Sequence, residues 1–235
     1  MKKNDLVFIL ILIVLLLPFF MSVDVYNFYC QFNKEHGLIT GFIKFAILST
    51  LGESIGLRIK KGVYNEPGFG LLPKAIVWGF LGISIVAAFS IFKNGTPAFL
   101  EYLGFKDAKL SLKGDFSSIK LLTAFSISVA MNVVFAPVMM TFHKITDTHI
   151  HRWGGSIKSL TKPIRFGEIL KGIDWKVQWG FVFARTIPLF WIPAHTITFL
   201  LPDEFQILFA ALLSVFLGIL LSIAALKAEK NKTTI

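Results

Sequence analysis

The sequence predicts an all-α membrane protein: a polytopic integral helical bundle of about six transmembrane helices, with one amphipathic helix at the surface. Of its 235 residues, 54% are hydrophobic and only 16% are charged, whereas about a quarter of the residues of soluble domains are charged. A charge-free run covers residues 205–226. About 22 residues at 1.5 Å per residue suffice for a helix to cross a hydrocarbon core of roughly 30 Å. We expect residues 1–235 to form a single membrane domain.

The charge balance fits this class. The chain has 24 Lys and Arg against 14 Asp and Glu, a formal net charge of +10. Because the basic residues lie between apolar runs, we expect them to set the topology and contact anionic lipid headgroups, with no nucleic acid as partner. Sixteen of the 24 fall on one side of a six-span topology with both termini inside, against six on the other. Cys30 is the sole cysteine, so neither an internal disulfide nor a cysteine metal cluster is available.

Residues 5–24 are expected to form the first span, a retained signal anchor. Lys2 and Lys3 precede an apolar run that only Pro18 and Ser22 interrupt, and no small-x-small cleavage site follows it. Tyr26 and Tyr29 would then lie as aromatic anchors at the far interface.

The second span, about residues 38–57, contains a carboxylate. Gly52 and Gly56 have the Gly-x-x-x-Gly spacing that lets two helices approach closely. Glu53 beside them is costly at membrane depth, by several kcal/mol, unless it is paired, neutralised or hydrated. Two interpretations stand: a structural ion pair with Lys60 or Arg58 near the interface, or a direct functional role.

The third span, about residues 71–92, is expected to stop at residues 94–97 (Asn-Gly-Thr-Pro), with a short interfacial helix at 97–105. The fourth, about residues 119–142, carries Asn132 and Pro137 at depth, and the proline frees the carbonyl of Val133. One face of this helix is polar and could line a cavity or make interhelical hydrogen bonds. Its members are Ser128, Asn132, Ala136, Met139 and His143.

The segment after the fourth span contains Asp147, His149 and His151, three residue types that bind metal ions. No fourth ligand is evident and the segment is expected to be a basic loop, so solvated interfacial histidines are the favoured interpretation. Neither a metal nor another cofactor is expected. Thr161 and Pro163 then predict the start of the amphipathic surface helix. Its apolar stripe consists of Ile164, Phe166, Ile169, Leu170 and Ile173.

The fifth span, about residues 175–201, is apolar but interrupted by Arg185 and by several prolines. Glu53 is the natural partner of Arg185 by sign. The sixth span follows Pro202, and residues 228–235 form a polar tail. The residues expected to pack helices or bend them are Gly52, Gly56, Pro137, Pro188, Trp191, Pro193 and Pro202.

Three motifs together resemble the Mpv-seventeen family, which includes the twenty-two-kilodalton peroxisomal membrane protein. The first is residues 51–53 (Leu-Gly-Glu), where the family commonly has Gly-Asp, and the second is residues 134–137 (Val-Phe-Ala-Pro). The third is the closing pattern of Trp191, His195, Thr198, Phe199, Leu201, Pro202 and Gln206, in which His195 and Gln206 replace a family Gln and Arg.

The chain departs from the family in its spacing, with one extra residue between Trp191 and Pro193 and one residue missing before Pro202. It also has Met131 and Asn132 where the family has Asp-Gln before Phe-Ala-Pro. The likeness covers residues 37–227, as in a remote, bacterial member. It implies a small protein of a bacterial inner membrane, or of a mitochondrial inner or peroxisomal membrane in a eukaryote, that forms a pore or moves small metabolites.

We therefore expect a channel or transport-related protein rather than an enzyme, with an unidentified ion or small-molecule substrate. Its polar interior would consist of Glu53, Asn132, Arg185 and His195, and self-association is left open. Two alternatives remain. One is an intramembrane enzyme acting on a lipid or isoprenoid through Asp147, His149 and His151. The other is a structural or assembly protein whose buried charges only fix helix packing.

Overall fold

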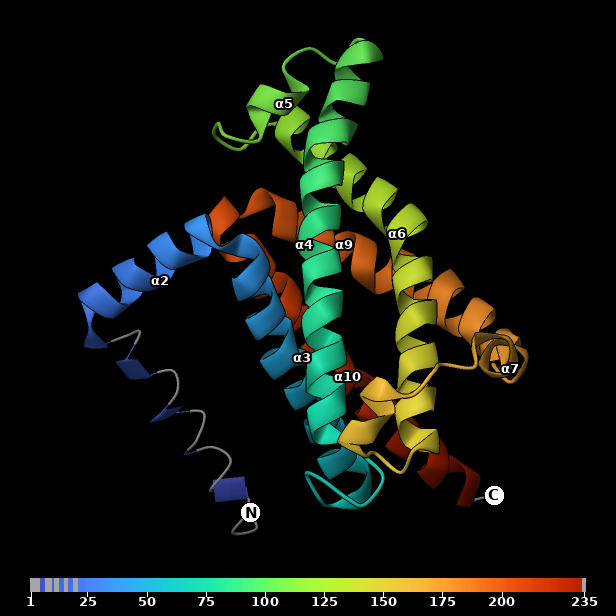
Figure 1. The fold of residues 1–235 in the computed structure, drawn as a ribbon. Helices are drawn as coiled ribbons and strands as arrows, with labels where there is room; N and C mark the ends of the chain where they lie inside the picture. Colours follow the sequence, from blue (N-terminus) through green and yellow to red (C-terminus); the bar gives the residue numbers. More distant parts are fainter. Residues whose placement is uncertain (1–4, 7–9, 11–12, 15–16, 19–20, 234–235) are drawn as a thin grey trace.

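The computed structural model describes residues 5–6, 10, 13–14, 17–18 and 21–233, and within these ranges it consists of helices without strands (Figure 1). The all-α prediction is confirmed for this part of the chain. The elements are α2 (Val23–Glu35), α3 (Gly37–Lys61), α4 (Leu71–Tyr102), α5 (Ala108–Ser111), α6 (Ser118–Arg152), η1 (Ile157–Thr161), α7 (Phe166–Lys171), α8 (Trp175–Val177), η2 (Gln178–Trp191), α9 (Ile192–Leu200) and α10 (Asp203–Thr233).

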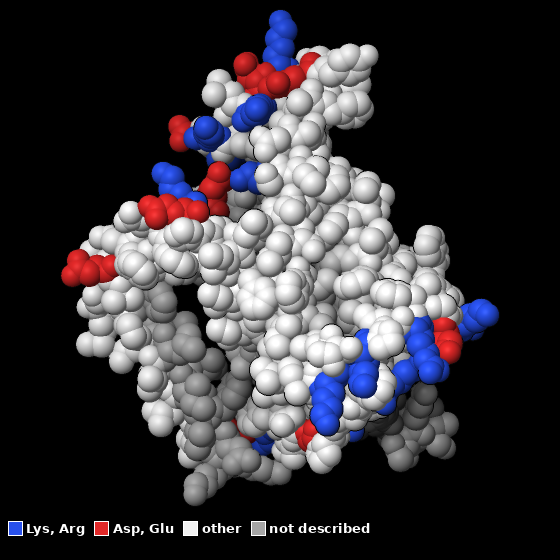
Figure 2. Space-filling model, in the orientation of Figure 1, with Lys and Arg blue, Asp and Glu red and all other residues white. Residues whose placement is uncertain are grey.

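Four helices are long and apolar enough to cross a membrane, which supports the membrane prediction. Among the described residues these are Gly37–Lys61, Leu71–Tyr102, Ser118–Arg152 and Asp203–Ile223. Figure 2 shows the matching surface on one face, where a broad uncharged belt separates charged side chains at the two ends. The predicted count of six spans is not confirmed, and most of the predicted first span, 5–24, lies outside the described residues.

The bundle is built around α3 and α4, which pack together along their lengths, with α10 against α3 and α6 against α4 (Figure 1). Phe45 of α3, Ile85 and Phe89 of α4, Ile127 of α6 and Phe199 of α9 form the centre of the main apolar core. In Figure 1, α4 lies in front between α3 and α6, and α10 passes behind them.

Glycines permit a close helix crossing between α3 and α10. A Cβ added to Gly52 would lie 2.8 Å from the Cα atom of Val215, and one added to Gly56 would lie 2.7 Å from the Ser222 hydroxyl oxygen. From the other side, a Cβ on Gly218 would lie 3.1 Å from the Gly52 carbonyl oxygen. Gly52 and Gly56 therefore lie in a helix interface, as their spacing predicts, and α10 is the partner.

Two predicted helix ends are wrong. α4 continues through residues 94–97 to Tyr102, with Pro97 and Leu100 buried and α5 packed against it, so 97–105 is no separate interfacial helix. Burial of this last part of α4 outweighs the one backbone hydrogen bond that Pro97 cannot make. Likewise α6 continues beyond Phe142 to Arg152, so the Asp147–His151 segment is helical rather than a loop.

The predicted amphipathic helix is shorter than expected. Thr161 ends the 3-10 helix η1 instead of capping α7, which begins at Phe166. Its apolar side does pack, because Ile169 and the following Ile173 join Ile145 of α6 in a small buried cluster.

The predicted fifth span is not one regular helix. It consists of α8, the π-helix η2 with Pro188 inside it, and α9 with Pro193 in its first turn, and Leu201 and Pro202 then separate α9 from α10. These segments run obliquely behind α6 and α4 in Figure 1. Together they lead the chain from the end of the bundle at which α6 ends to the opposite end, at which α10 begins.

The glycine crossing gives a first test. Gly52→Ala should lower the free energy of unfolding by about 1–3 kcal/mol, because the new methyl group has only backbone to displace. Gly95→Ala, also within a helix but with open space around its Cβ position, should be neutral or stabilising by up to about 1 kcal/mol. Thermal unfolding in detergent compares the stability of the two variants. Equal melting temperatures would show that the α3–α10 crossing has room for the added methyl group.

Candidate functional site

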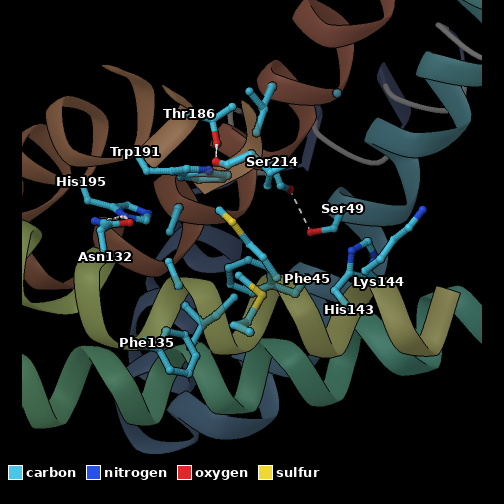
Figure 3. Close-up of a pocket in the computed structure, with 18 of the residues that line it drawn as sticks. Phe45, Ser49, Asn132, Phe135, His143, Lys144, Thr186, Trp191, His195 and Ser214 are labelled. Carbon is cyan, nitrogen blue, oxygen red and sulfur yellow. Dashed lines mark hydrogen bonds between the residues drawn. The ribbon is translucent and has the colours of Figure 1, made fainter. Parts of the chain in front are cut away.

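A cavity of about 310 Å³ lies between α3, α4, α6, η2, α9 and α10. This volume is at the lower end of the range for small-molecule sites in proteins. Its wall is mainly aromatic, aliphatic and thioether, and Figure 3 shows these side chains between two groups of polar residues. Apolar side chains of the wall include Phe45, Phe89, Met131, Phe135, Met139, Met140, Phe181, Val182 and Leu217.

The Glu53 carboxylate forms the first polar group, where α3, α4 and α6 meet. Its Oε2 atom accepts from Lys74 Nζ at 2.6 Å, and its Oε1 atom accepts from Trp78 Nε1 at 2.7 Å and contacts His143 Nε2 at 3.2 Å. Lys74 Nζ also lies 2.5 Å from Asp147 Oδ1. The Trp78 and His143 rings are in contact at a tilt of 39°, with their centroids 4.3 Å apart. Two carboxylates therefore share one lysine, and both oxygens of Glu53 have a hydrogen-bond donor.

The predicted partners of Glu53 are wrong. Arg58 forms a bidentate pair with Asp5, at 2.8 and 2.9 Å, instead of with Glu53. Arg185 is exposed on η2 and does not line the cavity, so the expected Glu53–Arg185 pair does not form. The pair was predicted from the signs of the charges alone, and the wider turns of a π-helix also change which side chains face the bundle.

The second polar group joins α6 to α9 and contains Asn132 and His195. The Asn132 side-chain nitrogen donates to the Ser128 carbonyl oxygen at 2.8 Å and lies 3.0 Å from His195 Nδ1. The Ser128 hydroxyl donates to the Ile192 carbonyl at 2.7 Å. The Trp191 ring lies over His195 at a centroid distance of 5.2 Å, and its indole N–H has no hydrogen-bond partner among the described residues.

The cavity is elongated between these two groups. Asn132 and His143 are both on α6, eleven residues apart, so the helix rise places them about 16 Å apart along its axis. The polar face predicted for this helix is present, because Asn132, Ala136, Met139 and His143 all line the cavity. Of the four residues predicted for a polar interior, the structure brings Glu53, Asn132 and His195 to one cavity, at opposite ends, and leaves Arg185 out.

The residues of the metal alternative do not converge. Asp147 is paired with Lys74, His149 is buried with its Nε2 atom 2.9 Å from the Ser159 carbonyl oxygen, and His151 is exposed. Within the described parts of the chain, no group of three His, Cys, Asp or Glu side chains could hold a metal ion.

Four further side chains of the candidate site are not among those predicted from the sequence. Lys74, Trp78, Lys144 and Gln178 take part in the Glu53 group or line the cavity. The four-residue spacing of Lys74 and Trp78 puts both on one helix face. That spacing was an available signal, since a cation and an indole N–H on one face suit a buried carboxylate.

Comparisons of the chain with protein-family models, with curated proteins and with solved structures find no match.

The Glu53 group gives a second test. Lys74→Gln should lower the free energy of unfolding by about 2–4 kcal/mol, because it leaves two carboxylates without their shared cation. Adding Glu53→Gln should restore part of this loss, because one of the two carboxylates is then gone.

Lys61→Gln is the matched control for a lysine in an exposed ion pair, here with Glu66. It should cost no more than about 1 kcal/mol. Melting temperatures in detergent compare the three variants, and equal effects of the two lysine substitutions would contradict the assignment.

Proposed function

We propose that this protein is a small channel or transporter of the membrane, and that the solute passes through the central cavity. The observation that supports this is the cavity itself, into which Glu53, Asn132 and His195 open from three different helices. Polar side chains at membrane depth are costly, and in transport proteins they mark the solute pathway.

The irregular helix beside the cavity also supports the proposal. η2 and α9 form one wall, through Gln178, Phe181, Val182, Thr186, Trp191 and His195. Pro188 lies inside η2 and Pro193 at the start of α9. Helices with broken hydrogen bonding are tolerated at membrane depth where they are buried in protein or line a cavity, and transporters place their binding sites beside such helices.

A resemblance to the Mpv-seventeen family implies the same class of activity. The residues that carry it include Glu53, Ala136, Trp191 and His195, all of which line the cavity. By the same resemblance, we propose the inner membrane of a bacterial cell as the location.

The competing proposal is a structural or assembly protein without transport activity. The complete matching of the Glu53 oxygens favours it, because a carboxylate bonded to Lys74, Trp78 and His143 already has a packing role. The two proposals differ in whether the cavity must be open to solutes, which only a transport protein requires.

Release of solutes from liposomes separates them. Liposomes containing the purified wild-type chain should release encapsulated radiolabelled ions and small metabolites faster than protein-free liposomes. Ala136→Trp puts an indole into the cavity and should return the rate to that of protein-free liposomes. Glu53→Gln should change the rate as well, because it removes a charge from the cavity wall.

Ala98→Trp, at an exposed position of α4, is the control and should leave the rate unchanged. Wild-type liposomes that remain tight to every solute would favour the structural proposal. Each variant is first compared with the wild type by thermal unfolding, so that a misfolded protein is recognised.

A further inference from the structure

Gln178, at the start of η2, is a buried residue whose side-chain amide reaches the cavity. Only 7% of the residue is exposed, and it lines the cavity. Its backbone N–H donates to the Asp174 carbonyl at 2.8 Å, but its side chain has no hydrogen-bond partner in the described part of the chain. Buried polar side chains are nearly always hydrogen-bonded, so an unmatched amide that faces a cavity points to a ligand.

Lys144 lines the same cavity and makes no ion pair with any described residue. Figure 3 shows it next to His143, on the side of the cavity away from Asn132 and His195. Lys74, in contrast, is paired with both Glu53 and Asp147. An ammonium group is therefore available at the rim.

The packing of η2 and α9 against α6 puts Gln178 at the same end as Lys144. Near the far end, Asn132 contacts His195, and further along η2 Phe183 and Ile187 pack on Ala136. The two segments therefore run in opposite directions. Continuing this order, Gln178 lies beyond Val182, toward the end of α6 that carries residues 143 and 144.

The chemistry of this end suits an anion. Each oxygen of Glu53 already accepts a hydrogen bond, and the Lys74 ammonium group lies against both Glu53 and Asp147, so each of these carboxylates already has a cation beside it. Lys144 and the Gln178 amide supply N–H donors, and hydrogen bonds from an ammonium group to a carboxylate are among the stronger ones in proteins. Beyond them the wall is apolar for most of the roughly 16 Å along α6 to Asn132.

We propose that the cavity binds a single-chain amphiphile with an anionic carboxylate head, of the medium-chain fatty acid class. The carboxylate lies against Lys144 and Gln178. The acyl chain extends between the methionines of α6 and the aromatic side chains of α4 and η2, toward His195. This inference rests on the proposed function, since it names the solute class of the same cavity.

The head group is tested with three ligands that share one tail. Binding of radiolabelled dodecanoate to the full-length protein in neutral-lipid nanodiscs should be saturable. Dodecanol and dodecylammonium should compete about tenfold less well, since each loses the charge-assisted hydrogen bonds. Equal competition by all three compounds would overturn the proposal, and this comparison needs no variant.

The residues are tested with variants. Lys144→Gln and Gln178→Leu should each weaken dodecanoate binding, by about tenfold for the lysine, and leave dodecanol competition unchanged. Lys158→Gln, an exposed lysine of η1 outside the cavity, is the control and should bind as the wild type does. An equal loss in Lys144→Gln and Lys158→Gln would mean adsorption to a basic surface and would refute the site.

The outcome is separable from that of the solute-release assay. Liposomes that release solutes while dodecanoate fails to bind would refute the proposed solute class and leave the transport function standing. Tight liposomes with specific dodecanoate binding would instead refute transport and retain the binding site.

Discussion

The Glu53 carboxylate is the group on which the arrangement of the bundle most depends. A charge in a membrane-spanning helix must be matched, and no single neighbouring helix matches it here. Lys74 and Trp78 come from α4 and His143 from α6, so one carboxylate on α3 fixes the rotation of two other helices. Asp147 extends the group by sharing Lys74. These side chains meet at one end of the bundle, and the cavity next to them is lined mainly by apolar residues.

The cavity follows from a difference between the two sides of the bundle. On one side, glycines bring α3 into backbone contact with α10 and with α4, where a Cβ on Gly82 would lie 2.6 Å from the Gly41 carbonyl oxygen. On the other side, α6 faces η2 and α9, whose prolines and wide turns prevent equally close packing. Thioether and aromatic side chains partly fill the remaining gap.

Much of this could be predicted, because its causes are local in the sequence. Apolar runs predict the long helices, and the spacing of Gly52 and Gly56 predicts a tight interface. Asn132 and His195 are conspicuous because polar groups are rare in apolar helices. The partner of Glu53 could not be predicted in this way, since Arg58, Lys60, Lys74 and Arg185 all have the right sign. The choice depends on helix rotation, and for Arg185 on the π-helix.

Other errors have similar physical reasons. Residues 94–97 have the composition of a helix stop, but packing against α5 and α6 extends α4 past them. Asp147, His149 and His151 are close in the sequence, which suggests a cluster of metal ligands. On the helix that they form, His149 points away from the face shared by Asp147 and His151, and it contacts Ser159. On that shared face, Asp147 is held by Lys74, whereas His151 is exposed.

The glycine crossing of α3 and α10 has a mechanical consequence for the cavity. At Gly52 and Gly218 the two backbones are in direct contact, so little side chain lies between the helices there to absorb a displacement. On the opposite side, η2 is held to α6 by a small apolar cluster around Ala136. α9 is fixed more firmly, by the Ser128–Ile192 and Asn132–His195 contacts and by Phe199 in the main core. The cavity thus has one stiff wall and one compliant wall. A change in its volume would be taken up by the movement of η2, while α9 and the rest of the bundle keep their places.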